Sequence, residues 1–513
     1  MAVLLLQAPA PRGLHAQGTA STRSVHALAT SGTAKAGNTT NSGAATRRRP
    51  FTRTISGQVT SFDESTPLEG VLVSVRGTNW VSGSQQDGSY YIPVKEDDTV
   101  LVFSLNEFQT YEVRLTEENQ YNIVLHKGFS PIGEWRGVFR VRPDLQVPFN
   151  FEIRKTDNGD PKIFFLNAEE KFDGGRVQQT ADSLLISLDQ FDNQLAFAIR
   201  GNATLSGVLR RQDGKGTPIP VTAETGQRYR FKETGTPPAG NFSGTYDITF
   251  HGENGKEEKA VGLLQQDGSK LRATFLRVTG DSRYLQGIVE GDHFYLSSFI
   301  GSGPSYYKGS FTKDGQLSGE IEGARGSQHF SGIANSAAAL PDPYKLTYLK
   351  EGYHSFDFSF PDVDGKLISP KDEKYKNKVV IVTIGGTWCP NCVDEAGFLA
   401  PWYKANRSRG VEIIALQYER QTDPVFVKKV LTRQKERFGI EYDQVFAGIA
   451  DKAGVAASLP ALNNFLSFPT TIIIDKKGRV AEIHTGYTGP ATGKYYEDFI
   501  KAFNEEIDTL LKS

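Results

Sequence analysis

Hydrophobic and polar residues alternate along the chain from about residue 55 to residue 340, in short runs that end at turn-forming residues. Because successive side chains of a strand point to opposite faces of its sheet, this pattern is typical of strands with one buried face. Near the start the runs are rich in β-branched residues, and Asp-Gly or Pro/Gly turns separate them. We predict a small β-sandwich over residues 51–128. Its runs are 55–59, 67–79, 87–94 and 98–105.

The alternation continues through the middle of the chain, with glycine-marked turns and no long helical pattern. Gly133-Glu-Trp135 returns as Gly244-Thr-Tyr246 about 110 residues later, and two further anchors repeat at nearly this spacing. We predict an antiparallel β domain over residues 129–345, a duplicated β-meander that folds as one barrel or two packed sandwiches. Its aromatic residues favour a filled barrel core, with a ligand mouth as the alternative. They are Tyr284, Phe294, Tyr295, Phe299, Tyr306 and Tyr307.

After residue 345, apolar runs alternate with amphipathic helices, which predicts an α/β domain over residues 346–513. The run 378–386 has the β-branched, apolar character of a buried central strand. A helix should follow from about Val393 to Arg409 and end at Gly410. The predicted fold class is therefore multidomain, with all-β N-terminal and middle regions followed by an α/β domain. The other expected elements are a strand at 411–418, a helix at 423–439, a hairpin at 469–486 and a closing helix.

Residues 1–50 are predicted to form a disordered leader. From about residue 17 this segment is rich in Ser, Thr, Ala and Gly and has too few large apolar side chains to form a core. Its first six residues are apolar but shorter than the hydrophobic region of a secretory signal. The segment reads either as the remnant of a signal whose start lies upstream or as a plain tail.

Charge and hydropathy restrict the class of partner. The chain has 58 Lys and Arg against 59 Asp and Glu, which gives no electrostatic reason to expect nucleic acid. No apolar run approaches the ~18 residues of a membrane-spanning helix. We therefore expect neither a nucleic-acid partner nor a membrane span.

The two cysteines of the chain, Cys389 and Cys392, carry the clearest chemical signal. A structural zinc site needs ~4 ligands, and no second Cys or His pair stands nearby at a ligand spacing. A c-type haem attachment needs His directly after the second Cys, where the chain has Val393. We expect a redox pair, with no metal and no cofactor.

The predicted elements place this pair at a strand-to-helix junction. A Cys at the N-terminus of a helix lies near free N–H groups and the positive end of the dipole, which favour thiolate over thiol. Cys389 is thus the expected nucleophile, and Cys392, one turn later, the thiol that resolves the mixed disulfide. Trp388 would shield one side of the pair.

Residues 355–505 resemble the TlpA/ResA-type thioredoxin-like reductases of bacterial envelopes. The motifs that carry the resemblance are Trp388-Cys389-Pro390-Asn391-Cys392, Glu395, Phe468-Pro469-Thr470-Thr471 and Ile474-Asp475-x-x-Gly478. The resemblance implies a thioredoxin-like fold and a cis proline at Pro469 against the redox pair. It also implies that the backbone of Phe468 binds an extended substrate segment, so Trp388, Phe468 and Pro469 are the candidate substrate-binding residues.

Two positions depart from the thioredoxin pattern. Thr383 stands where thioredoxins proper have a buried Asp, and Gly397 replaces the proline that kinks the helix. Proton handling would then fall to Glu395, as the TlpA/ResA resemblance implies, and Glu395 lies on the same helix face as Cys392. A surface carboxylate without a catalytic role is the alternative for Glu395.

The sandwich resembles the non-catalytic carboxypeptidase regulatory-like domain found at the front of Bacteroidetes outer-membrane and secreted proteins. Together the two resemblances imply a periplasmic or cell-envelope protein. The matching residues are Gly57, Pro67, Leu68, Gly70, Val71, Gly77, Thr78, Asp87-Gly88 and Tyr90.

We therefore expect a thiol–disulfide oxidoreductase that reduces disulfides in envelope proteins and is itself reduced by an upstream thiol donor or electron-transfer protein. A peroxiredoxin is disfavoured, because Gly386 and Val382 stand where that motif needs Thr or Ser and Pro. The alternative from another class is an envelope binding protein whose β region recognises a peptide or glycan, with the redox domain accessory. His354 and His484 lack a partner at a recognisable spacing and are expected to be structural or surface groups.

Overall fold

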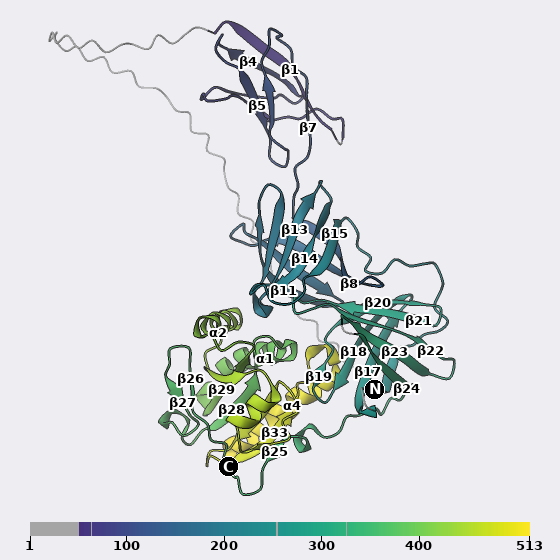
Figure 1. Cartoon of the computed structure of the whole chain (residues 1–513), viewed down its shortest axis with the longest axis vertical. Helices are drawn as coiled ribbons and strands as arrows, with labels where there is room; N and C mark the ends of the chain where they lie inside the picture. The colour runs from purple at the N-terminus through teal and green to yellow at the C-terminus, as the bar shows by residue number, and fades with distance from the viewer. Residues whose placement is uncertain (1–50, 63, 253–254, 325) are drawn as a thin grey trace, which may run out of the picture.

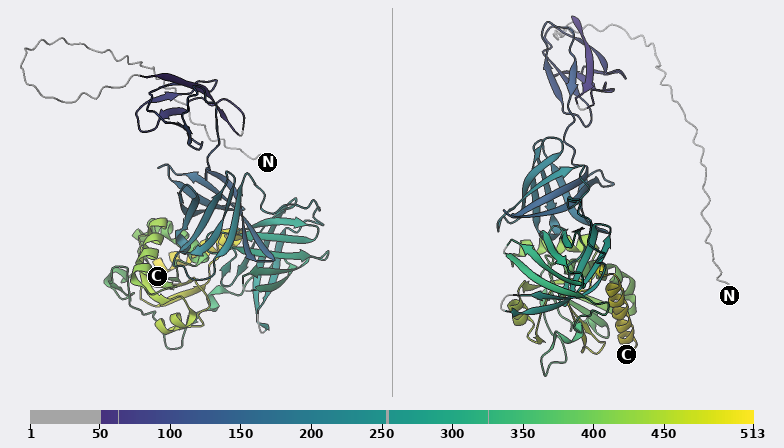
Figure 2. Two further views of the ribbon diagram at one scale, coloured as in Figure 1. Left: turned by 45° about the horizontal axis from the view of Figure 1, so that its top comes forward. Right: turned by 90° about the vertical axis from the view of Figure 1, so that its right-hand side faces the viewer.

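The structure is a computed structural model that describes residues 51–62, 64–252, 255–324 and 326–513, and the predicted leader lies outside these ranges. A β-sandwich leads into two β-barrels and then into an α/β domain, so the predicted fold class is confirmed (Figure 1). The sandwich connects to the rest through one stretch of chain, whereas the barrels and the α/β domain lie against one another (Figure 2). No helix within the described ranges is long and apolar enough to cross a membrane.

The N-terminal sandwich consists of a three-stranded and a four-stranded sheet. Alternate residues of its strands, such as Ile55 and Val59, are fully buried between the sheets. The strands are β1 (Arg53–Ser61), β2 (Leu72–Val75), β3 (Val81–Gly83), β4 (Ser89–Val94), β5 (Val100–Ser104), β6 (Tyr111–Arg114) and β7 (Ile123–Leu125). The sheet orders are β4-β1-β7 and β3-β2-β5-β6.

The first barrel is closed and has eight antiparallel strands around an aromatic-rich core. A 3-10 turn, η1 (Asp189–Phe191), interrupts the path between its fifth and sixth strands. The strands are β8 (Gly133–Arg142), β9 (Leu145–Lys155), β10 (Pro161–Asn167), β11 (Glu170–Gln179), β12 (Ser183–Leu188), β13 (Asn193–Arg200), β14 (Thr204–Arg211) and β15 (Ile219–Thr225).

The second barrel repeats this arrangement. Its strands are β16 (Gly244–His251), β17 (Glu257–Asp267), β18 (Lys270–Arg277), β19 (Gly280–Asp281), β20 (Leu285–Glu290), β21 (His293–Ser298), β22 (Ser305–Phe311), β23 (Gln316–Gly323) and β24 (Gly326–Ala334). The expectation of one barrel or two sandwiches is wrong. Each of the two barrels closes on itself. In the second barrel β24 pairs with β16 and β17 pairs with β18, so that no long strand edge stays unpaired. We keep 51–128, 129–345 and 346–513 as proposed domain boundaries.

Side chains from the second barrel complete the core of the first. Phe299, directly after β21, is 1% exposed, and its ring packs on Phe139 and Phe165 with both centroids 4.7 Å away. Arg230, in the link between the barrels, is buried and donates to the Ser297 carbonyl at 2.7 Å and to Asn167 at 3.2 Å. The two barrels therefore share buried contacts.

The α/β domain has a five-stranded sheet in the order β30-β29-β28-β32-β33, with hydrophobic clusters on both faces. Strand β28 is central and wholly buried, as its apolar sequence predicted. The strands are β28 (Val379–Gly385), β29 (Val411–Glu419), β30 (Asp443–Ile449), β32 (Thr470–Ile474) and β33 (Val480–Thr485). The helices are α1 (Pro390–Asn406), α2 (Pro424–Phe438), α3 (Lys452–Ser458) and α4 (Lys494–Lys512), with 3-10 turns η3 (Pro343–Lys345), η4 (Glu373–Tyr375), η5 (Arg407–Arg409) and η6 (Pro490–Thr492). The small ladders are β25 (Tyr348–Leu349) with β31 (Leu462–Asn463) and β26 (Phe360–Pro361) with β27 (Leu367–Ile368).

Helix α1 carries a proline, but not where thioredoxins have theirs. Pro401 lies inside the helix and has no N–H to donate to the carbonyl of Gly397, four residues earlier. After η5 the chain ends its helical path at Gly410, which adopts the left-handed conformation with φ 94° that glycine tolerates best.

We predict that Phe299→Ala destabilises the first barrel by about 3–5 kcal/mol, because it leaves a cavity among packed aromatic rings. Ile333→Ala on β24 is the control, since Ile333 is 60% exposed and should change stability by no more than about 0.5 kcal/mol. Hydrogen exchange of amides in β8 to β15 measures the effect. Unchanged exchange in these strands would show that Phe299 does not support the first barrel.

Candidate active site

Cys389 stands at the junction between central strand β28 and helix α1. Its backbone is extended, and its sulfur accepts a hydrogen bond from the N–H of Cys392 at 3.2 Å. Helix α1 begins at Pro390, earlier than the predicted start near Val393, because proline fits the first helical position and the sulfur caps a free N–H group. Sγ of Cys389 therefore lies at the positive end of the helix dipole, where a thiolate is stabilised.

Cys389 and Cys392 form a disulfide, with their Cα atoms 5.2 Å apart. Each residue is only 5% exposed, so protein covers the sulfurs almost completely. The arrangement supports exchange between a disulfide and a dithiol within one helical turn.

The loop before β32 faces this pair. The Phe468–Pro469 peptide bond is cis, as the resemblance implied, and the Phe468 carbonyl oxygen lies 3.5 Å from Sγ of Cys389. This contact is not a hydrogen bond, since a disulfide sulfur carries no proton. The ring of Phe468 meets that of Trp388 edge to face at 5.5 Å, and Nε1 of Trp388 donates to the Tyr418 carbonyl at 2.9 Å. Trp388 and Phe468 thus line one side of the pair.

Glu395 is buried rather than exposed, which excludes the alternative of a surface carboxylate. Its Oε1 accepts a hydrogen bond from the Thr471 hydroxyl at 2.6 Å, which joins α1 to the strand that follows the cis proline. Burial raises the pKa of Glu395 to about 7, although the Thr471 hydrogen bond opposes the rise. The carboxyl can therefore hold or release a proton near neutral pH.

A cavity of about 20 Å³ adjoins Glu395, with Thr471, His484 and Tyr487 in its wall. This volume accommodates about one water molecule. His484 is buried, Nδ1 lies 3.1 Å from the Gly486 carbonyl oxygen, and burial lowers the pKa of His484 to about 4. The imidazole is thus neutral at pH 7, and its burial excludes the surface position, one of the two that the sequence predicted for His484.

The family models match two parts of the chain. The model described as Redoxin matches residues 350–498, and that of the CarboxypepD_reg-like domain matches residues 55–129. The thiol-disulfide oxidoreductase ResA of Bacillus thuringiensis subsp. konkukian is 31% identical over 150 residues, which are 29% of this chain and 76% of that protein. The chain belongs to the ResA family of thiol–disulfide oxidoreductases. Both resemblances seen in the sequence are confirmed, and the protein is a redox enzyme.

Other proteins are similar to part of the chain. Thioredoxin-like protein YneN of Bacillus subtilis is 28% identical over 138 residues, which are 27% of this chain and 73% of that protein. Among solved structures, a thiol-disulfide oxidoreductase from Bacteroides fragilis is 16% identical, with 29% of this chain and 99% of that chain covered and a TM-score of 0.22. A thiol:disulfide interchange protein from Chlorobium tepidum is 23% identical, with 34% and 99% covered and a TM-score of 0.24.

Charged residues that the sequence did not single out join the ResA-type domain to both barrels. Arg283 of the second barrel forms ion pairs with Asp394 of α1 and with Glu170 of the first barrel. It also donates to the Pro390 carbonyl at 3.3 Å, between the two cysteines. Burial raises the pKa of Asp394 to about 7, against the lowering effect of Arg283. Sequence reasoning missed this cluster because its members lie more than 100 residues apart.

The first barrel supplies a second contact with the redox motif. Val393, directly after Cys392, packs into the aromatic core of the first barrel. Gln190 of η1 donates to the Thr387 carbonyl at 2.8 Å. The sequence contains no local signal for either contact, because Val393 reads as an ordinary apolar helix residue.

Glu419, at the end of β29, is a further buried carboxyl that sequence reasoning missed. It accepts hydrogen bonds from the N–H of Thr387 at 2.8 Å and from the Thr387 hydroxyl at 3.0 Å. Burial raises the pKa of Glu419 to about 7. Glu419 thus fixes the backbone just before Trp388.

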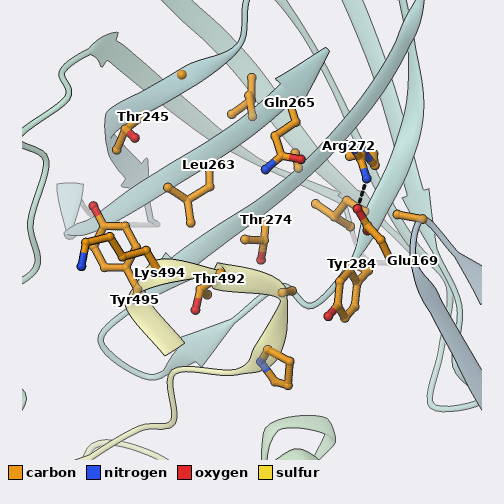
Figure 3. A pocket seen from close by; sticks show the side chains of 18 of the residues that line it. Glu169, Thr245, Leu263, Gln265, Arg272, Thr274, Tyr284, Thr492, Lys494 and Tyr495 are labelled. Carbon is orange, nitrogen blue, oxygen red and sulfur yellow. Dashed lines mark hydrogen bonds and ion pairs between the residues drawn. The ribbon is translucent and has the colours of Figure 1, made fainter. Parts of the chain in front are cut away.

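A cleft of about 790 Å³ opens where both barrels meet the start of α4 (Figure 3). The Glu169–Arg272 ion pair lies along its wall. Of the six aromatic residues considered for a ligand mouth, Tyr284 lines this cleft. Phe294, Phe299 and Tyr307 of that set are buried in barrel cores, as the core interpretation predicted. The residues of the redox motif do not line this cleft.

We predict that Glu395→Gln removes a step near pH 7 from the pH dependence of Cys389 alkylation in the reduced protein. Above about pH 7 the Glu395 carboxylate adds negative charge one turn from Cys392 and disfavours a nearby thiolate. The measurement is the alkylation rate from about pH 5 to pH 9. Glu436→Gln, exposed on α2, is the matched control and should keep the step.

The same variant should change how stability depends on pH. Folded protein holds a proton on Glu395 that the unfolded chain, with an ordinary pKa of 4.5, releases. The associated stability is complete below pH 4.5 and is lost as pH rises to about 7, and Glu395→Gln should abolish that loss. An unaltered alkylation profile and an unaltered stability slope would contradict a titrating Glu395.

Proposed function

We propose that this protein is an envelope thiol–disulfide oxidoreductase that reduces disulfides in other proteins through Cys389 and Cys392. The observation that carries the proposal is the position of Sγ of Cys389, which caps helix α1 and lies 3.5 Å from the Phe468 carbonyl oxygen. A sulfur in this place is stabilised as a thiolate and faces the loop expected to hold an extended substrate segment.

In the first step the Cys389 thiolate of the reduced enzyme attacks one sulfur of the substrate disulfide. The bond between the two substrate sulfurs breaks, a mixed disulfide with Cys389 forms, and the released substrate thiolate takes up a proton. Trp388, Phe468 and Pro469 are the proposed substrate contacts. Among them, the rings of Trp388 and Phe468 are in edge-to-face contact, and the Phe468 carbonyl oxygen lies 3.5 Å from Sγ of Cys389.

In the second step the Cys392 thiol loses its proton and attacks Sγ of Cys389. The mixed disulfide breaks, the second substrate thiolate leaves and is protonated, and the enzyme keeps the Cys389–Cys392 disulfide, so two electrons pass to the substrate. We assign Glu395 as acceptor of the Cys392 proton, because it lies one turn further along α1 and its pKa of about 7 matches the task.

An external reductant must return two electrons to the Cys389–Cys392 disulfide before the next turnover. We propose an upstream thiol donor or electron-transfer protein for this role and a periplasmic or cell-envelope location for the exchange. The match to ResA-type oxidoreductases and the CarboxypepD_reg-like domain support this assignment.

The alternative is an envelope binding protein in which the β region recognises a peptide or glycan. The cleft of about 790 Å³ between the barrels and α4 is the observation that favours it. Deleting the barrels is a poor test of this alternative, because it would expose Val393 and leave Asp394 without Arg283. Substitutions of the cysteines leave the cleft intact and therefore distinguish the reductase from the binding protein more clearly.

We predict that Cys392→Ser accumulates covalent, reductant-sensitive complexes with protein partners, whereas Cys389→Ser traps almost none. Without Cys392 the mixed disulfide on Cys389 cannot be resolved. Affinity purification from the native envelope, followed by non-reducing and reducing gels and mass spectrometry, measures this and identifies the substrates.

Trapping by Cys389→Ser but not by Cys392→Ser would reverse the two roles and contradict the mechanism. Partners that stay bound to the Cys389→Ser/Cys392→Ser double variant under reducing conditions would favour the binding-protein alternative instead.

A further inference from the structure

Three loops of the ResA-type domain lie at or beside the redox pair, and we call the surface that they share the groove. They are the first turn of α1, the cis-proline loop before β32 and the turn after β33. The last two are joined directly, since the N–H of Gly486 donates to the Pro469 carbonyl at 2.9 Å. This groove is the surface on which an extended substrate segment would meet Cys389.

A short segment of the second barrel, residues 278–283, contacts all three loops. We call it the cap; it contains β19 and follows β18 (Figure 1). At the cis-proline loop, the Ser467 hydroxyl donates to the Thr279 carbonyl at 3.2 Å. At the turn after β33, the N–H of Gly489 donates to the Asp281 carboxylate at 2.6 Å.

The closest approach of the cap is to the residue between the cysteines. A Cβ atom built on Gly280 would lie 2.1 Å from Nδ2 of Asn391. Likewise, a Cβ on Gly486 would lie 2.4 Å from the Val278 carbonyl oxygen. At Gly486 a Cβ would overlap backbone atoms of the cap, whereas at Gly280 it would overlap the amide at the end of the Asn391 side chain.

Arg283 holds the cap in place at its C-terminal end. Its side chain is buried and reaches Asp394 and the Pro390 carbonyl on α1, while Glu170 of the first barrel binds the same guanidinium. Taking this arginine out of the contact would leave two carboxylates without their partner, which makes release costly.

We propose that the cap is a built-in occupant of the substrate groove, which the extended segment of a protein disulfide must displace before it reaches Cys389. The contacts of the Thr279 carbonyl and of Asp281 take up polar groups at the groove edge, and each cysteine residue is 5% exposed. The second barrel thereby selects substrates, favouring flexible disulfide-bearing segments over disulfides fixed in rigid folds. This inference rests on the proposed function, since it concerns the groove of that same site.

Gly280→Ala tests the cap, because its methyl group overlaps the amide of Asn391 and should break the close contact between the cap and this residue. Gly326→Ala is the matched control in the same barrel. Both glycines have φ of 130°, so both variants carry the same backbone strain, but a Cβ on Gly326 has no atom within 4 Å. Only Gly280→Ala should loosen the groove.

The readout is the rate at which Cys389 of the full-length, reduced protein reacts with N-ethylmaleimide and with the same maleimide on a long poly(ethylene glycol) chain. Gly280→Ala should raise the ratio of the rate with the bulky maleimide to the rate with N-ethylmaleimide about tenfold. Gly326→Ala should leave the ratio at its wild-type value. Equal ratios in the two variants would overturn the proposal.

A measurement on the wild-type protein keeps the test independent of how Gly280→Ala folds. If the cap covers the groove, the bulky maleimide should react more slowly than N-ethylmaleimide by a much larger factor at Cys389 than at the thiol of glutathione. An equal factor at both thiols would contradict the cap. Trapping by Cys392→Ser reports on the proposed function separately. If Cys392→Ser traps partners but the bulky maleimide is not disfavoured at Cys389, the cap proposal is wrong and the proposed reductase function stands. If the bulky maleimide is disfavoured but no partner is trapped, the proposed reductase function is contradicted and the cap is not.

Discussion

The ion pairs of Arg283 are the interaction on which the arrangement of the redox site depends. One buried guanidinium from the second barrel binds a carboxylate of the first barrel and Asp394 of helix α1, and both carboxylates are largely shielded from water. Because a buried charge is tolerated only when it is paired and hydrogen-bonded, these ion pairs hold the three parts of the chain in one relative position as long as no substrate displaces the cap. In that position, residues of the barrels cover the first turn of α1 and therefore Cys389.

Burial has a second consequence, which concerns protons. Three carboxyls near the redox motif, Glu395, Asp394 and Glu419, have pKa values raised to about 7, in each case chiefly by burial. A carboxyl that titrates near neutral pH can exchange protons with thiols, whereas an exposed one is fully ionised there. Of the three, Glu395 lies on the same helix face as Cys392, one turn away, which is why we assign it the proton.

Local sequence patterns predicted much of this structure. The apolar run of β28, the two cysteines at a strand-to-helix junction and the proline before β32 are short-range signals, and the structure has all three. The predicted start of α1, near Val393, is too late, because cysteine is not among the residues that usually cap a helix. The closure of two barrels and the role of Arg283 could not be read from the sequence, since both depend on contacts between residues far apart in the chain.

The equilibrium reduction potential of the Cys389–Cys392 pair, measured against glutathione or thioredoxin buffers by thiol labelling, tests the central claim most directly. A reductase of protein disulfides should have a potential of about −250 mV or lower, near the ≈ −270 mV of thioredoxin. A potential above about −150 mV, close to the ≈ −120 mV of a strong disulfide oxidant, would contradict the account, as would a pair that does not exchange at all.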